Sequence, residues 1–191
     1  QDEGDWTAAA ECSATSTARN SSWHGTHVSG TVGAVTNNAL GVAGVAFNAR
    51  IQPVRVMGKC GGLISDIVDG IVWASGGTVA GIPANATPAK VINMSLGGSG
   101  TCDVAYQTAI DGAVARGTVV VVAAGNSNAN ASGHRPANCN NVIAVASLDR
   151  EGNRASYSNY GANVDIAAPG GETSPTAANG GVGRADTRAQ Q

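Results

Sequence analysis

The stretch that decides the fold is Val119-Val120-Val121-Val122-Ala123-Ala124-Gly125-Asn126. Its first six residues are continuously apolar, with none of the alternation expected of a strand that has one face in water. Such a run is typical of a strand buried on both faces of a parallel sheet. The sequence therefore predicts a central strand over 119–124 that ends at a glycine followed by an asparagine.

Strand-like and helix-like segments alternate on both sides of this run. Apolar, β-branched residues predict further strands over 50–56, 91–95, 142–148 and 164–167. Helical spacing predicts three helices: one from near His24 to the turn at 36–38, one with an apolar stripe over 64–72, and one over 105–114 stopped by Gly117. This rhythm predicts an α/β fold with a mostly parallel sheet flanked by helices, whose functional groups gather beyond the carboxyl ends of the strands.

Composition and charge exclude two classes of protein. The 191 residues suffice for one domain with a sizeable core, and 42 % of them are apolar. Only 13 % are charged, the net charge is −2, and the two lysines do not form a basic cluster, so nucleic-acid binding is not expected. The longest apolar run is far shorter than the roughly 20 residues that span a membrane, so no membrane partner is expected either. The first residues lack a signal-peptide pattern, so we expect any export signal to lie outside this sequence.

Four cysteines stand at positions 12, 60, 102 and 139. None of their spacings matches a zinc site or a C-x-x-C redox motif. Two disulfides in an oxidising compartment suit this arrangement, with three possible connectivities, while four buried free thiols are the alternative.

A histidine opens the first predicted helix, in Trp23-His24-Gly25-Thr26-His27-Val28-Ser29-Gly30-Thr31. An imidazole titrates near working pH and suits general-base catalysis, and the neighbouring glycine lets other backbone approach closely. Two other interpretations stay open. His24 is structural or merely exposed, or it pairs with His27 as a metal ligand, although no third ligand at a familiar spacing follows.

Two strand ends complete the candidate site. At the end of the central strand, the small residues of Ala123-Ala124-Gly125-Asn126 leave room for a pocket into which the Asn126 amide can donate; an ordinary Gly-Asn turn is the alternative. The strand at 91–95 continues into Leu96-Gly97-Gly98-Ser99-Gly100, whose backbone can pair with an extended peptide; a flexible turn is the alternative.

Taken together and in this order, these segments resemble the subtilisin family. The family's histidine motif is matched by His24-Gly25-Thr26-His27-Val28-Ser29-Gly30, with Ser29 where alanine is commoner. Its substrate-binding strand is matched by Asn93-Met94-Ser95-Leu96-Gly97-Gly98, and its oxyanion motif by residues 123–126. Residues 41–46, 155–161 and 166–170 add supporting matches, so the resemblance covers roughly residues 20–171. It is strongest to the secreted enzymes of Gram-negative bacteria. It implies a three-layer subtilisin-like fold, incomplete at both ends.

The resemblance implies a serine endopeptidase that forms an acyl-enzyme. His24 is then the general base and Asn126 the side-chain donor to the oxyanion. The remaining site residues line the primary substrate pocket, which with such small linings is expected to accept large apolar side chains. One wall, which also binds substrate backbone, is formed by Ser95, Leu96 and Gly97, and the opposite wall and floor by Ala123, Ala124 and Gly125.

The family also implies a structural calcium ion in the loop after the first helix. Its ligands are the carbonyls of Val35, Leu40 and Val42 and the side chain of Asn38. All are oxygen donors, as calcium prefers, and further partners are needed to complete the site. Asp2 and Asp5 are candidates for a second ion, with a solvated acidic loop as the alternative.

For the cysteines, the resemblance favours the pairs Cys12–Cys60 and Cys102–Cys139. It further implies a secreted, extracellular protein that acts on protein or peptide substrates and binds its own propeptide. We expect a monomer.

The family's catalytic triad runs Asp, His, Ser along the chain, and the motifs of the aspartate and the serine are missing from this sequence. No apolar strand precedes an aspartate upstream of His24, and no Gly-Thr-Ser-Met-Ala motif follows, since Ser174 stands before Pro175 without a preceding glycine. We therefore expect residues 1–172 to be the central part of one peptidase domain, 173–191 to be a divergent or unstructured tail, and the chain alone to be inactive. The alternative is a catalytically inactive homologue that acts as a binding protein. A nucleotide-binding domain is not indicated, because neither glycine-rich phosphate motif occurs.

Overall fold

The computed structural model of the chain describes residues 4–172. They divide into two compact units, one up to Ile67 and one from Val68 onward, and the division falls inside helix α2 (Ile64–Ala74). The C-terminal tail predicted over 173–191 lies outside the described residues, and the expected domain boundary at 172 stays a prediction. No described helix has the length and apolar character needed to cross a membrane.

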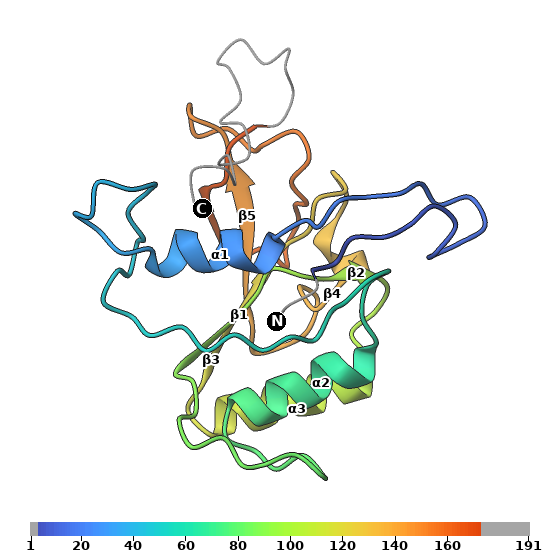
Figure 1. Cartoon of the computed structure of the whole chain (residues 1–191), viewed down its shortest axis with the longest axis vertical. Helices are drawn as coiled ribbons and strands as arrows, with labels where there is room; N and C mark the ends of the chain where they lie inside the picture. The colour runs from blue at the N-terminus through green and yellow to red at the C-terminus, as the bar shows by residue number, and fades with distance from the viewer. Residues whose placement is uncertain (1–3, 173–191) are drawn as a thin grey trace. The chain divides into compact units, whose positions relative to one another are not determined.

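The second unit is built on a four-stranded parallel sheet. Its strands are β1 (Val91–Met94), β3 (Val119–Ala123), β5 (Ile143–Leu148) and β6 (Ile166–Pro169), in the order β1-β3-β5-β6. Figure 1 labels the first three of them. Met94 pairs with Val122, and Ala123 pairs with Val145, so β1, β3 and β5 run in register. The strands predicted over 91–95, 119–124, 142–148 and 164–167, and the α/β class with a mostly parallel sheet, are confirmed.

Helix α3 (Val104–Ala115) connects β1 to β3 and packs against β3. The Asp103 side chain caps it by accepting a hydrogen bond from the Tyr106 amide, and Gly117, at φ 88°, follows its end. The core includes Ile110, Ala113, Val120 and Val122, all at most 1 % exposed. Burying each of the larger side chains stabilises the fold by about 1.5–3 kcal/mol.

The prediction that the central strand is buried on both faces is wrong. Burial alternates along β3: Val120 and Val122 are 1 % exposed, whereas Val119 is 44 % exposed. A run of valines supplies strand propensity at every position, so the pattern alone does not reveal which face a neighbouring element covers.

A short antiparallel pair, β2 (Gly98–Ser99) with β4 (His134–Arg135), was not predicted. The 3₁₀ turn Ala131–Gly133 precedes β4, and the disulfide Cys102–Cys139 closes the same region. Two-residue strands joined across 35 positions carry no local periodicity, so the sequence pattern cannot reveal them.

The first unit contains helix α1 (His24–Gly33), the N-terminal part of α2 and long connecting segments. The predicted helix at His24 is confirmed. The disulfide Cys12–Cys60 ties the N-terminal segment to the segment before α2, which confirms both expected pairings and leaves no free cysteine.

The strand predicted over 50–56 is not formed. A strand needs a ladder of backbone hydrogen bonds, and in the described part of this unit the only bridges join Thr7 to Arg19 and Gly58 to Gly61. Apolar, β-branched residues therefore indicate strand propensity here without a neighbouring strand that realises it.

Candidate active site

Two strand ends meet at the carboxyl edge of the sheet. Because Met94 of β1 lies opposite Val122 of β3, the chain leaves β1 at Ser95 next to Ala123, the last residue of β3. Neighbouring strands are about 4.8 Å apart, so the two predicted walls of the substrate site, 95–97 and 123–125, begin as neighbours. This is the edge where parallel sheets gather functional groups.

Both walls contain positions where only a small residue fits. Ala124 is 1 % exposed. A Cβ on Gly97 would lie 2.6 Å from the Arg135 carbonyl oxygen, and Gly125 combines φ 111° with a Cβ position blocked by the Asn159 side chain at 2.3 Å. These two glycines therefore leave room for the Arg135 carbonyl and the Asn159 side chain, which a larger residue would displace.

Asn126 follows Gly125 directly and is exposed. Its side chain makes no hydrogen bond to any residue between 4 and 172, although the backbone around it is extensively bonded. A primary amide in this state has two free N–H donors. The chemistry open to it is hydrogen-bond donation to an oxygen that develops negative charge nearby.

Sequence reasoning gave no role to Asn159, which belongs to the supporting match Ser158-Asn159-Tyr160-Gly161. The structure buries it completely, at 0 % exposure, against the loop that carries Asn126. Its side chain bonds the backbone of Ala124, Ser127 and Ala129. The only sequence signal for it was the match itself.

His24 lies in the first unit as the first residue of α1. Its side chain is exposed, and no carboxylate among the described residues bonds to its ring. Trp23 precedes it in the left-handed region, at φ 51°, a conformation that is uncommon for a bulky residue. His24 belongs to the first unit, and the strand-end residues belong to the second.

The Asp5 carboxylate is hydrogen-bonded to Ser22, two residues before His24. Asp5 accepts hydrogen bonds from the Ser22 amide and hydroxyl, both at 2.6 Å, and the Ser22 oxygen accepts from the His24 amide at 3.3 Å. The hydroxyl bond and then the amide bond from Ser22 lower the pKa of the Asp5 carboxyl. Both Asp5 oxygens are engaged within the chain, which argues against its expected role in binding a second ion. Asp2 lies outside the described residues.

The metal interpretation of His24 and His27 gains no support. Among residues 4–172, no three histidine, cysteine or acidic side chains converge on one point. The His27 Nε2 atom is buried and has no hydrogen-bond partner in the described chain.

The donor set predicted for calcium lies in the loop after α1. The Asn38 side-chain oxygen accepts a hydrogen bond from the Leu40 amide at 3.1 Å, which folds this loop locally. The carbonyls of Val35, Leu40 and Val42 accept no hydrogen bond from the described residues. Carbonyl and amide oxygens are the donors that a hard cation prefers, and four such donors are fewer than the six to eight that calcium takes.

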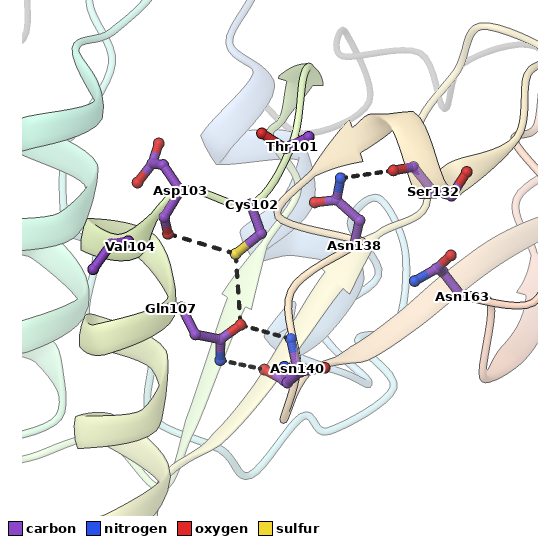
Figure 2. A pocket seen from close by; sticks show the side chains of 9 residues that line it. All are labelled: Thr101, Cys102, Asp103, Val104, Gln107, Ser132, Asn138, Asn140 and Asn163. Carbon is purple, nitrogen blue, oxygen red and sulfur yellow. Dashed lines mark hydrogen bonds between the residues drawn. The ribbon is translucent and has the colours of Figure 1, made fainter.

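A separate hollow of about 520 Å³ lies beside the Cys102–Cys139 disulfide (Figure 2). Two of its amide side chains are bonded within the chain: Gln107 bonds both the backbone amide and the carbonyl of Asn140, and Asn138 donates to the Ser132 carbonyl. None of the six predicted substrate-binding residues lines it. It is therefore distinct from the strand-end site.

Fold, strand-end geometry and motif order define an α/β protein of the subtilisin type, and comparison with known families agrees. The model of the Subtilase family matches residues 2–191, and the chain belongs to this family. It is 67 % identical over 169 residues to an extracellular protease of Xanthomonas campestris pv. campestris, covering 88 % of this chain and 29 % of that protein. It is 51 % identical over 173 residues to an extracellular basic protease of Dichelobacter nodosus, covering 88 % and 29 %.

Solved structures agree with the fold. A protease from Pseudoalteromonas arctica superposes with a TM-score of 0.88 at 66 % identity, over 91 % of this chain and 51 % of that one. A cold-adapted subtilisin-like serine proteinase gives a TM-score of 0.64 at 38 % identity, over 76 % and 48 %. The predicted subtilisin-like fold is thereby confirmed. The chain spans less than a third of the length of these extracellular proteases from Xanthomonas and Dichelobacter, and the activity of the whole protein is therefore a proposal.

Proposed function

We propose that the protein containing these residues is a serine endopeptidase that works through an acyl-enzyme. The observation that carries the proposal is the exposed, unbonded amide of Asn126 at the end of β3, beside the end of β1. Family membership supports peptide hydrolysis as the chemistry.

In the proposed reaction, the serine hydroxyl attacks the scissile carbonyl carbon while His24 accepts its proton. The carbonyl oxygen becomes an oxyanion that receives a hydrogen bond from the Asn126 amide. As the C–N bond breaks, His24 returns the proton to the leaving amine, and water then hydrolyses the acyl-enzyme by the same route. The serine and the aspartate that orients His24 are proposed to lie outside the 191 residues, since neither motif occurs among them.

The substrate is proposed to be an extended peptide. Ser95, Leu96 and Gly97 continue from β1, which is an edge strand of the described sheet, and their backbone is suited to pairing with substrate. The wall at 123–125 is made of alanine and glycine, so the pocket between the walls is proposed to take a large apolar side chain.

We further propose a structural calcium ion held by the carbonyls of Val35, Leu40 and Val42 with the Asn38 side chain, completed by ligands from elsewhere. Subtilases generally bind structural calcium. Oxygen donors of the chain would cross-link the loop through the ion and stabilise it. Chelation is expected to lower the thermal unfolding midpoint of the full-length protein, and the Asn38→Ala variant is expected to show a smaller decrease. Equal midpoints with and without chelator would contradict the proposed calcium site.

The relatives from Xanthomonas and Dichelobacter are named extracellular proteases. Together with two disulfides, this supports a secreted protein. A monomer that binds its own propeptide is proposed on the family resemblance alone.

The test is hydrolysis of a peptide with a large apolar residue before the scissile bond by a full-length protein that carries residues 1–191. His24→Ala is expected to lower kcat by several powers of ten at unchanged thermal stability, because the exposed ring bonds no described residue. A folded full-length protein that binds such a peptide without cleaving it would establish the alternative function, an inactive binding homologue.

A further inference from the structure

We propose that Asn159 is a positioning residue that holds the backbone on both sides of Asn126 and thereby aims the Asn126 amide. The inference rests on the proposed role of Asn126 as oxyanion donor. All the residues that carry it lie in the second unit.

Four hydrogen bonds join Asn159 to the Asn126 loop. The Asn159 Nδ2 atom donates to the Ala124 carbonyl at 2.9 Å, and its Oδ1 atom accepts from the Ser127 and Ala129 amides at 2.9 and 3.1 Å. The Asn159 backbone amide donates to the Gly125 carbonyl at 2.9 Å. The bonds therefore fall on 124, 125, 127 and 129 and leave Asn126 itself free.

The position of these bonds makes them strong constraints. Asn159 is 0 % exposed, so water does not replace a bond that breaks. A buried polar group that loses its partner carries its full desolvation penalty. The four bonds, which we call the Asn159 latch, therefore hold the loop backbone on both sides of Asn126 in one conformation.

The space around Gly125 is a second, independent observation that links Asn159 to the Asn126 loop. A Cβ at this position would lie 2.3 Å from the Asn159 Nδ2 atom, so the Asn159 amide occupies the space that any other side chain would need. The absence of a side chain at Gly125 is thus required by the position of Asn159.

Asn159 is itself anchored to the sheet. The neighbouring Ser158 hydroxyl donates to the Asn159 carbonyl at 3.1 Å and accepts from the Ser147 amide of β5 at 2.9 Å. Arg154 donates to both the Ser158 carbonyl and the Asn128 side chain. Hydrogen bonds through Ser158 and Asn159 therefore connect strand β5 to the loop that follows β3.

The closing experiment uses a matched pair of variants. Asn159→Ala removes the latch, and Asn85→Ala removes another asparagine with three backbone bonds, to the carbonyls of Trp73 and Ala74 and the amide of Thr87. In the 191-residue chain, Asn159→Ala is expected to lower hydrogen-exchange protection of the Ser127 and Ala129 amides at least about tenfold, as loss of a buried bond allows. It also shifts the Asn126 side-chain NMR signal. Asn85→Ala does neither.

In the full-length protein, Asn159→Ala is expected to lower kcat at nearly constant KM, and to cost nothing further when Asn126→Ala is already present, because the two residues act as one unit. Unchanged protection at Ser127 and Ala129, or a kcat loss that persists in the Asn126→Ala background, would overturn the inference. An inactive wild-type protein would refute the proposed function instead, and the Asn126 NMR signal would still decide the latch. Asn159→Ser, which replaces the amide with a small polar hydroxyl, serves if the alanine variant does not fold.

Discussion

Replacing Asn126 with alanine separates catalysis from stability. The side chain is exposed and bonds no residue between 4 and 172, so its removal breaks no described contact. A surface substitution of this kind changes the free energy of unfolding by no more than about 0.5 kcal/mol. The fold is therefore expected to be unaffected.

The effect on catalysis is expected to be large. One hydrogen bond to the oxyanion is lost, and the rate cost is about 10²–10³ in kcat, the range known for the equivalent asparagine of a subtilisin, a member of this family. At about 1.36 kcal/mol per factor of ten, this corresponds to about 2.7–4 kcal/mol of transition-state stabilisation. KM changes little, because the ground-state carbonyl does not lie where the oxyanion forms.

The assay is steady-state peptide hydrolysis by the full-length protein, paired with urea denaturation of the same preparations. Asn48→Ala is the matched control: its side chain is likewise exposed, bonds no residue between 4 and 172, and lies outside the candidate site. It is expected to retain kcat. A kcat for Asn126→Ala within threefold of wild type, or a fall in stability that accounts for its lost activity, would refute the reasoning.

Three further predictions concern stability, each measured by denaturant unfolding of the oxidised chain. Hydrogen bonds from Ser22 lower the pKa of Asp5, so its carboxylate stabilises the fold above about pH 4, and this contribution is lost as pH falls through the lowered pKa. Asp5→Asn is therefore expected to be less stable than wild type at pH 7. A difference in unfolding free energy between the two proteins that stayed constant down to pH 2 would contradict this. Replacing both Cys102 and Cys139, which are 37 positions apart, with alanine is expected to cost about 4 kcal/mol in the loop-entropy model, and an unchanged midpoint would count against it. Ile110→Ala, at a position 0 % exposed, is expected to cost about 2–5 kcal/mol, and a loss below 0.5 kcal/mol would show that the site is not core.

The sequence predicted the elements whose signal is local. The helix that starts at His24, the helix α3 and the strand β3 carry their own periodicity or apolar run, and the strand ends that form the candidate site followed from them. The motif resemblance then supplied the roles of His24 and Asn126, which no single segment supports alone.

What the sequence could not predict depends on partners distant along the chain. The strand expected at 50–56 needs a neighbouring ladder, and the pairing of β2 with β4 joins two dipeptides that have no pattern of their own. Asn159 is the instructive case. Asparagine before tyrosine and glycine reads as a turn, and only the structure shows that its side chain reaches back to the loop at 124–129.

The central claim is that His24 and Asn126 serve a serine nucleophile that lies outside these 191 residues. Labelling with a serine-directed fluorophosphonate, followed by mapping of the modified peptide, tests it most directly. We predict that the isolated chain takes up no label, while the full-length protein is modified at one serine beyond residue 191 and loses that labelling in His24→Ala. A label on any serine within residues 1–191 would contradict the account.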